Sequence, residues 1–169
     1  AIQGMVRAAA DHLLSKGITQ IHDAGTSVEA LTAIEALAQA GDLKVRVYAM
    51  VDGSSEEGWK LLRWAPRVGL YDHRLTVRSV KLMADGALGS RGALLTEAYS
   101  GAAGNRGLAV TTPHELMAKA REATERGYQV SIHAIGDAGN RMVLDIFETI
   151  MARALRKGDS PRARIEHAQ

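Results

Sequence analysis

The sequence contains no cysteine among its 169 residues, which excludes disulfide bonds, cysteine-bound zinc and thiol catalysis. It has only one Phe, two Trp and four Tyr, so few side chains could stack on single-stranded bases. Positive and negative residues nearly balance, at 21 Lys and Arg against 19 Asp and Glu, and no basic run stands out. Apolar runs stay far below the roughly 18 residues of a membrane span, and no signal-peptide pattern is present. These absences predict a soluble cytoplasmic protein that binds neither nucleic acid nor membrane.

Strands and helices are predicted to alternate along the chain. Apolar residues recur every three or four positions in the helical segments, whereas short β-branched and apolar runs indicate strands. The predicted helices are 1–16, 28–40, 56–64, 113–126 and 140–157, and the predicted strands are 18–25, 44–51, 75–83, 128–135 and 163–168. This alternation is typical of an α/β fold with a parallel sheet. No linker divides the elements, so a single domain over residues 1–169 is expected.

Local signals mark the helix starts and the core. Ser27 and Thr112 stand where N-terminal caps are expected, and Thr112 is followed by Pro and, three residues on, by Glu. Trp59, Trp64 and Phe147 lie at helical spacing and are expected in the core. Residues 86–107 form a long Gly- and Ala-rich stretch without a period, which predicts a functional or disordered loop. Its glycines fit neither common phosphate-binding motif, and the chain has no GxSxG sequence.

Polar side chains gather where the predicted strands end. They are His22 and Asp23, Asp52, Lys81 and Asp85, His133 and Asp137, and Glu166 and His167. In α/β folds the ligand site lies at the carboxyl ends of the strands. The candidate site is therefore expected among these residues.

Lys81 is unusual because it lies inside an apolar strand, in the run SVKLM. A buried ammonium group must be paired, modified or led out to solvent. One interpretation is a lysine that reaches solvent or pairs with Asp85, since alternation places Lys81, Met83 and Asp85 on the same strand face. The other is a lysine with a lowered pKa that acts as a base, a nucleophile or a carbamate.

His133 and His167 lie near the ends of two successive strands. Each alone could be a hydrogen-bonded structural histidine, but together with Lys81 on the preceding strand they favour a metal site. Neutral imidazole suits a divalent ion such as Zn²⁺.

Three further residues have equally open interpretations. His22 and Asp23 could line the same end of the sheet, or Asp23 could close a strand-end turn through its side chain. Arg91, in the sequence GSRG, could bind a substrate carboxylate or carbonyl, or it could be an exposed loop residue.

Three long motifs resemble the amidohydrolase superfamily, specifically its amidohydrolase-3 branch, which includes N-substituted formamide deformylases. They are VKLMADGALGSRGALL (80–95), VSIHAIGDAGNRMVLDIFE (130–148) and RIEHAQ (164–169). The segment GITQIHDAG (17–25) fits the second-strand region of the same branch. The resemblance implies a (β/α)8 TIM barrel with one or two divalent metal ions, often zinc.

The resemblance also implies roles for individual residues. Lys81 matches the strand-four lysine that is carboxylated in binuclear members, and His133 and His167 match the ligands of strands five and six. The implied reaction is hydrolysis of a carbon–nitrogen bond in a small amide-type substrate by metal-activated water. Asp85, Arg91, Asp137 and His22 are implied as substrate contacts or as residues that orient the ligands.

The chain also departs from the family pattern. The HxH pair of the first strand and the Asp of a later strand have no counterpart, so the chain corresponds to about five βα units, strands two to six of the barrel. Ala138 and Gly139 replace the arginine and alanine of the usual motif. A partial barrel with three of roughly six ligands is not expected to hydrolyse substrate alone. Its open sheet edges and exposed apolar face predict self-association into a homo-oligomer.

Two alternatives to a metal-dependent hydrolase remain open from the sequence. One is a non-catalytic half-barrel that serves as a binding or assembly module. The other is a metal-free barrel in which Lys81 forms a Schiff base with a carbonyl substrate.

Overall fold

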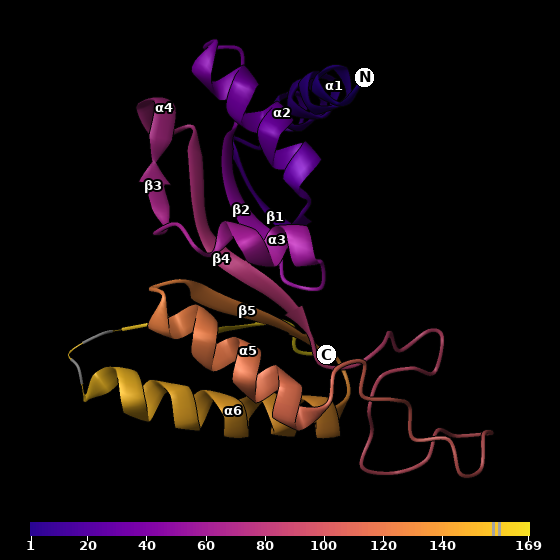
Figure 1. The fold of residues 1–169 in the computed structure, drawn as a ribbon. Coiled ribbons are helices and arrows are strands. Elements are labelled where there is room, and N and C mark those ends of the chain that lie inside the picture. Colours follow the sequence, from indigo (N-terminus) through magenta and orange to yellow (C-terminus); the bar gives the residue numbers. More distant parts are fainter. Residues whose placement is uncertain (157, 159) are drawn as a thin grey trace. The chain divides into compact units, whose positions relative to one another are not determined.

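The chain divides into two compact units, residues Ala1–Val80 and Lys81–Gln169, each built from strands and helices in alternation (Figure 1). The structure is a computed structural model, and it describes residues 1–156, 158 and 160–169. Strand β4 runs through the boundary between the units, because it spans Leu75–Met83.

The first unit contains two whole strands that pair in parallel, the first part of a third strand and a short antiparallel strand. Its elements are α1 (Ile2–Ser15), β1 (Gln20–Thr26), α2 (Val28–Gln39), β2 (Arg46–Asp52), α3 (Glu56–Leu61), β3 (Arg67–Gly69), α4 (Leu70–His73) and the first part of β4. Strand β1 pairs in parallel with β2, and β2 is the neighbour of β4. Strand β3 pairs antiparallel with β4 through Arg67 and Val77.

Side-chain caps and apolar periodicity explain these elements. Ser27 Oγ accepts a hydrogen bond from Ala30 N at 3.2 Å, and Ser55 Oγ does the same for Gly58 N at 3.1 Å, so both predicted helix starts are confirmed. Many of the buried side chains come from one face of α2 and from the strands β2 and β4: Leu31, Ile34, Leu37, Val47, Ala49, Val51, Leu75 and Val77. Burial of each large apolar side chain contributes about 1.5–3 kcal/mol to folding.

A left-handed turn that the sequence analysis did not predict follows β3. Tyr71, Asp72 and His73 all have positive φ, at 53°, 54° and 60°. The Glu35 carboxylate holds the start of this turn, because its Oε1 accepts from Tyr71 Oη at 3.1 Å and from Arg67 Nη1 at 2.7 Å. Partial burial and the neighbouring Glu35 raise the pKa of the Tyr71 phenol.

The second unit contains the end of β4 and the strands β5 (Gln129–Ala134) and β6 (Arg164–His167), in the order β4-β5-β6. Helix α5 (Pro113–Glu125) starts at the predicted cap, where Thr112 Oγ1 accepts from Glu115 N at 3.3 Å. Helix α6 (Asp137–Leu155) begins three residues before its predicted start. The predicted last residue of that helix, Lys157, lies outside the described residues.

Strand β5 is buried on both faces, and this positions the candidate site. Side chains alternate along a strand, so Val130 and Ile132 share one face while Ser131 and His133 share the other. Helices α5 and α6 lie side by side against β5 (Figure 1). Their buried residues pack with the apolar face: Leu116, Ala120, Ala123, Val143, Ile146, Phe147 and Ile150. The opposite face of the strand therefore carries the polar side chains.

Two sequence-based expectations about the fold are corrected. Trp64 is 61% exposed and lies outside the core, because α3 ends at Leu61 and the residue falls in the turn that follows; Phe147 is buried as expected. The structure has a sixth strand, β3, besides the five predicted, and with three residues it is too short to show a strand pattern in the sequence.

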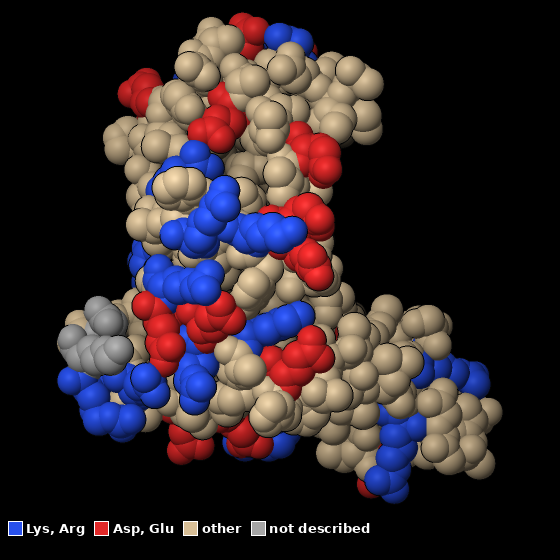
Figure 2. Space-filling view, in the orientation of Figure 1, with Lys and Arg blue, Asp and Glu red and all other residues tan. Residues whose placement is uncertain are grey.

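The alternation of strands and helices with parallel pairing places the chain in the α/β class, as part of a (β/α)8 barrel. Within the described residues no helix combines the length and apolar character needed to cross a membrane. Positive and negative side chains lie next to each other on the face shown in Figure 2.

Candidate metal centre at the ends of β4, β5 and β6

The three predicted ligands Lys81, His133 and His167 all lie in the second unit, toward the carboxyl ends of their strands. Lys81 is 7% exposed. Its Nζ donates to Leu82 O at 3.2 Å and approaches Met83 Sδ at 3.0 Å, which confirms that Lys81 and Met83 share a strand face.

His133 is held by two acceptors next to one ring nitrogen. Its Nε2 lies 3.4 Å from Gly86 O and 3.5 Å from Asp85 Oδ1. Both neighbours are hydrogen-bond acceptors, so we assign the proton of the neutral ring to Nε2, which leaves the Nδ1 lone pair open. Burial lowers the pKa of His133, and the positive charge of Lys81 lowers it further. The neutral form, which is the one that binds metal, is thereby favoured.

His167 meets His133 edge to face. The ring centroids are 4.7 Å apart and the planes are inclined by 73°. The strand register pairs His133 with Glu166 and pairs His167 with Ala134, so the two histidines are offset by one position. His167 has a φ of 80°, outside strand geometry, at the point where its ring contacts His133. His167 is exposed, unlike His133.

Glu166 is a neighbour of the site that the sequence marked only as a strand-end residue. It is the register partner of His133 and therefore shares its face of the sheet. Its Oε1 is shielded from solvent and makes no hydrogen bond among the described residues, although Arg164 Nη2 lies 2.9 Å away as an ion pair. The sequence could not place Glu166 beside His133, because this requires the register between β5 and β6.

Asp85 is fully buried, and its carboxylate binds the backbone. Oδ1 accepts from Ile135 N at 3.0 Å, and Oδ2 accepts from Gly136 N at 2.8 Å and from Leu94 N at 2.9 Å. With zero exposure, this carboxylate offers no surface to a substrate.

Asp137 and Arg91 lie farther out. The Asp137 carboxylate accepts from the backbone and hydroxyl of Thr96, and the Thr96 hydroxyl is the main cause of a lowered pKa for Asp137. Arg91 is exposed in the loop with a φ of 55°, and its carbonyl accepts from Asn105 Nδ2 at 3.4 Å.

His22 lies in the first unit, at an exposed position of β1. Its ring stacks on Tyr48 with centroids 4.7 Å apart. Asp23 Oδ2 accepts from Thr26 Oγ1 at 2.7 Å, which is the strand-end turn interpretation of that residue.

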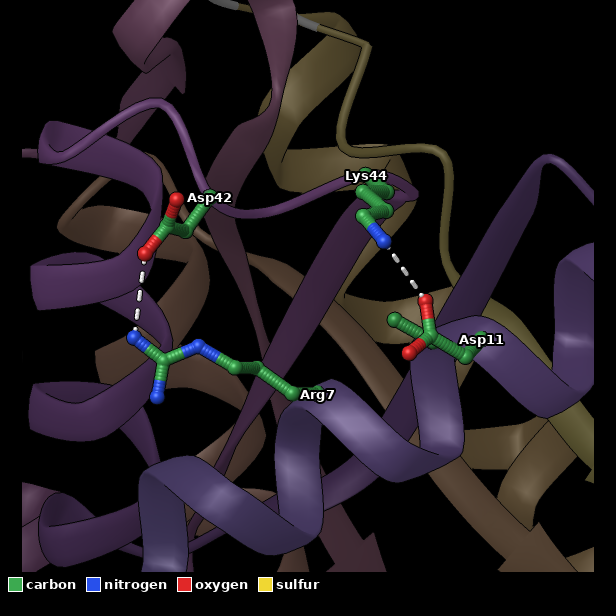
Figure 3. Close-up of a pocket in the computed structure, with 5 residues that line it drawn as sticks. Arg7, Asp11, Asp42 and Lys44 are labelled. Atoms are coloured by element: carbon green, nitrogen blue, oxygen red, sulfur yellow. Dashed lines mark hydrogen bonds and ion pairs between the residues drawn. The ribbon is translucent and has the colours of Figure 1, made fainter.

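A separate polar pocket in the first unit lies along α1 (Figure 3). Arg7 pairs with Asp42 at 3.0 Å, and Lys44 pairs with Asp11 at 2.9 Å. All four side chains are about half exposed or more, and each charge has a partner within the pocket. These pairs fasten α1 to the segment between α2 and β2.

Across the described part of the chain, no three His, Asp or Glu side chains come together as a complete metal-binding group. The site thus consists of two adjacent imidazoles and a buried lysine.

Comparison with known proteins identifies the family. The amidohydrolase family model matches residues 1–169, so the chain belongs to the amidohydrolase family. The chain is 31% identical over 139 residues to the putative amidohydrolase YtcJ of Bacillus subtilis, and 45% identical over 96 residues to Protein LONG AFTER FAR-RED 3 of Arabidopsis thaliana. It covers only 25% and 16% of the length of these two relatives.

Two solved structures share the fold. They are uncharacterized metal-dependent hydrolases from Pyrococcus horikoshii OT3 and Pyrococcus furiosus, with TM-scores of 0.84 and 0.83 and identities of 33% and 32%. The matches cover 99% and 98% of this chain but only 32% and 33% of those chains. The predicted family is therefore confirmed.

Proposed function

We propose that this chain contributes part of the metal centre of a hydrolase that cleaves carbon–nitrogen bonds in small amide-type substrates. The observation that carries the proposal is the contact between the His133 and His167 rings, with centroids 4.7 Å apart, next to the strand β4 that carries the buried Lys81. Membership of the amidohydrolase family and the likeness to metal-dependent hydrolases support it.

The donor set fits a divalent ion in part. His133 is favoured in the neutral form, with its Nε2–H directed toward the acceptors Gly86 O and Asp85 Oδ1. A ring held in this way presents its other nitrogen as a ligand, and His167 provides a second imidazole. Imidazole donors suit zinc, so we propose Zn²⁺ as the ion.

Lys81 becomes a donor only after it loses its positive charge. Carboxylation of Nζ would replace the ammonium group by an anionic oxygen ligand, and the buried position excludes much of the water that stabilises the charged amine. A divalent ion at such a site supplies an activated water molecule and polarises a carbonyl group. We propose that Lys81, His133 and His167 hold the ion, that Asp85 acts only through His133, and that Arg91 and Asp137 act indirectly or on the substrate.

Metal binding tests the proposal on the 169-residue chain. Isothermal titration with Zn²⁺ should show binding that is weakened at least about tenfold in His133→Ala and in His167→Ala. His12→Ala is the matched control, since this histidine is exposed in α1 and has no place in the proposed site, and it should bind as the wild type does. Equal Zn²⁺ affinity in all four proteins would contradict the proposal.

The alternatives predict other outcomes. A Schiff-base enzyme would be trapped at Lys81 by borohydride in the presence of a carbonyl compound, with no need for the histidine pair. A non-catalytic assembly module would bind no Zn²⁺ but would self-associate. Homo-oligomer formation stays a prediction, which light scattering during size-exclusion chromatography measures directly.

A further inference from the structure

We propose that Asp85 is a positioning residue: its buried carboxylate ties the 86–107 loop to the turn between β5 and α6, and so holds His133 in place. This role deepens the proposed function, since it matters for chemistry only if His133 is a ligand. The contacts themselves do not depend on that function.

The Asp85 carboxylate is buried among backbone donors. Asp85 has zero exposure and accepts from Leu94 N, Ile135 N and Gly136 N at 2.8–3.0 Å. A buried carboxylate needs such donors, and charge-assisted bonds to it are stronger than ordinary ones. The three backbone N–H groups thus replace the hydrogen bonds that water donates to an exposed aspartate.

The three N–H donors to Asp85 come from two segments that are far apart in sequence. Leu94 belongs to the 86–107 loop, whereas Ile135 and Gly136 follow β5 directly. Leu94 is held from both sides, because its carbonyl also accepts from Gly139 N at 3.1 Å. One carboxylate therefore joins the loop to the start of α6.

Two glycines leave space for the contacts between Asp85, Leu94 and the start of α6. A Cβ at Gly136 would lie 1.9 Å from Leu94 O, and a Cβ at Gly139 would lie 2.6 Å from Asp85 Oδ2. Any larger residue must displace the loop in the first case and the carboxylate in the second. Both glycines of the sequence GDAG are therefore needed for the close approach of Leu94 and Asp85.

Residues 84–86 contact His133 directly. Ala84, the residue before Asp85, donates from its N–H to His133 O at 2.9 Å. Asp85 Oδ1 and Gly86 O lie at 3.5 Å and 3.4 Å from His133 Nε2. The same short segment therefore contacts the backbone and the ring of His133.

Amide hydrogen exchange on the full chain tests the proposal. In Asp85→Asn, an amide group faces the backbone donors, so exchange at Leu94, Ile135 and Gly136 should accelerate about 10- to 100-fold. Exchange at Val130 and Ile132 should stay within about twofold of the wild type. Asp52→Asn is the matched control, because Asp52 also ends a strand but its Oδ1 accepts from the nearby Ser54, from N at 2.9 Å and from Oγ at 2.6 Å. It should leave the three amides unchanged.

Zn²⁺ affinity provides the second readout. Asp85→Asn should weaken Zn²⁺ binding about 10- to 100-fold, the usual effect of removing a group that orients a ligand. Ile150→Val loosens the buried face of α6 without touching the network, and its Zn²⁺ affinity should equal that of the wild type. If the wild type binds no Zn²⁺, the proposed function fails, and the exchange data alone decide the role of Asp85.

Three results would overturn the inference: unchanged exchange at the three amides, an equal acceleration in Asp52→Asn, or an acceleration spread over all of β5. If Asp85→Asn does not fold, Gly139→Ala takes its place, because its Cβ displaces the carboxylate without removing it. Faster exchange at the same three amides in that variant supports the role. Unchanged exchange contradicts it.

Discussion

The strand ends of the two units follow the same sequence pattern but form different contacts. In the first unit the polar residues bind close neighbours: Asp23 binds Thr26, and Asp52 binds Ser54. In the second unit two of them bind distant segments, since Asp85 binds residues 9 to 51 positions away and Asp137 binds Thr96 across 41 positions, whereas Glu166 pairs with nearby Arg164.

The difference shows what a polar residue at the end of a strand can do. A local bond finishes a turn and leaves neighbouring segments independent. A distant bond fixes two loops relative to each other, which is what a site assembled from several strands needs. The following predictions test this contrast between the units.

The largest effect is expected at Gly136. Its backbone conformation suits any residue, but an added Cβ would lie 1.9 Å from Leu94 O. Gly136→Ala should therefore lower the free energy of unfolding by about 3 kcal/mol, within the range of severe steric substitutions. Urea denaturation measures the change. The control Gly4→Ala, in α1 with nothing within 4 Å, should instead raise stability by about 0.5–1 kcal/mol. Equal effects would remove the contrast.

A smaller but still large effect is expected at Asp85. Asp85→Ala leaves three buried N–H groups without their acceptor, and each such group costs about 1 kcal/mol at the low end of the range for an unsatisfied donor. We expect a loss of about 3 kcal/mol at most for the set, against about 1 kcal/mol or less for Asp52→Ala. Thermal and urea unfolding of the two variants give the comparison. A loss in Asp52→Ala as large as that in Asp85→Ala would refute the distinction between local and distant bonds.

The outer contact between Asp137 and Thr96 should show a pH-dependent effect. The Thr96 hydroxyl holds the pKa of Asp137 below its ordinary value of 3.8. In Thr96→Val that pKa should rise, which ¹³C NMR of the carboxyl group detects. The stabilising contribution is fully present above pH 3.8 and is lost as the pH falls through the lowered pKa. Thr149→Val, on α6, should leave the Asp137 pKa as it is.

The smallest effect concerns the first unit, where Glu35 is an exception to the local pattern. Its carboxylate binds Arg67 and Tyr71, which are 32 and 36 positions away. Glu35→Gln removes the negative charge that helps to raise the pKa of Tyr71, so the phenol should ionise at a lower pH. Absorbance titration of the tyrosines measures the shift, with Tyr71→Phe to assign it. No change in the titration curve would mean that Glu35 does not act on this phenol.

Much of the fold was predictable because its signals are local. Caps at Ser27 and Thr112 and the apolar periodicity placed α2, α5 and β4 within a few residues of their observed bounds. The turn at Tyr71–His73 was missed because nothing in its side chains requires a positive φ. Trp64 was placed wrongly because helical spacing does not show where a short helix ends.

The positions of Lys81, His133 and His167 toward the ends of their strands were predictable, but their contacts were not. Alternation correctly placed Lys81 and Met83 on one face. It could not show the one-residue offset between His133 and His167, because strand register depends on tertiary pairing. The backbone partners of Asp85 were equally hidden, since Leu94 and Gly136 bear no polar side chain that would mark them.

The left-handed turn limits how this chain can change at three consecutive positions. Proline fixes φ near −65° and cannot occupy Tyr71, Asp72 or His73 without refolding the segment. Glycine adopts positive φ without steric cost, so Asp72→Gly should be tolerated at a position where most other replacements are not. A library of random substitutions here should accordingly be enriched in glycine and asparagine, a selection imposed by the backbone alone.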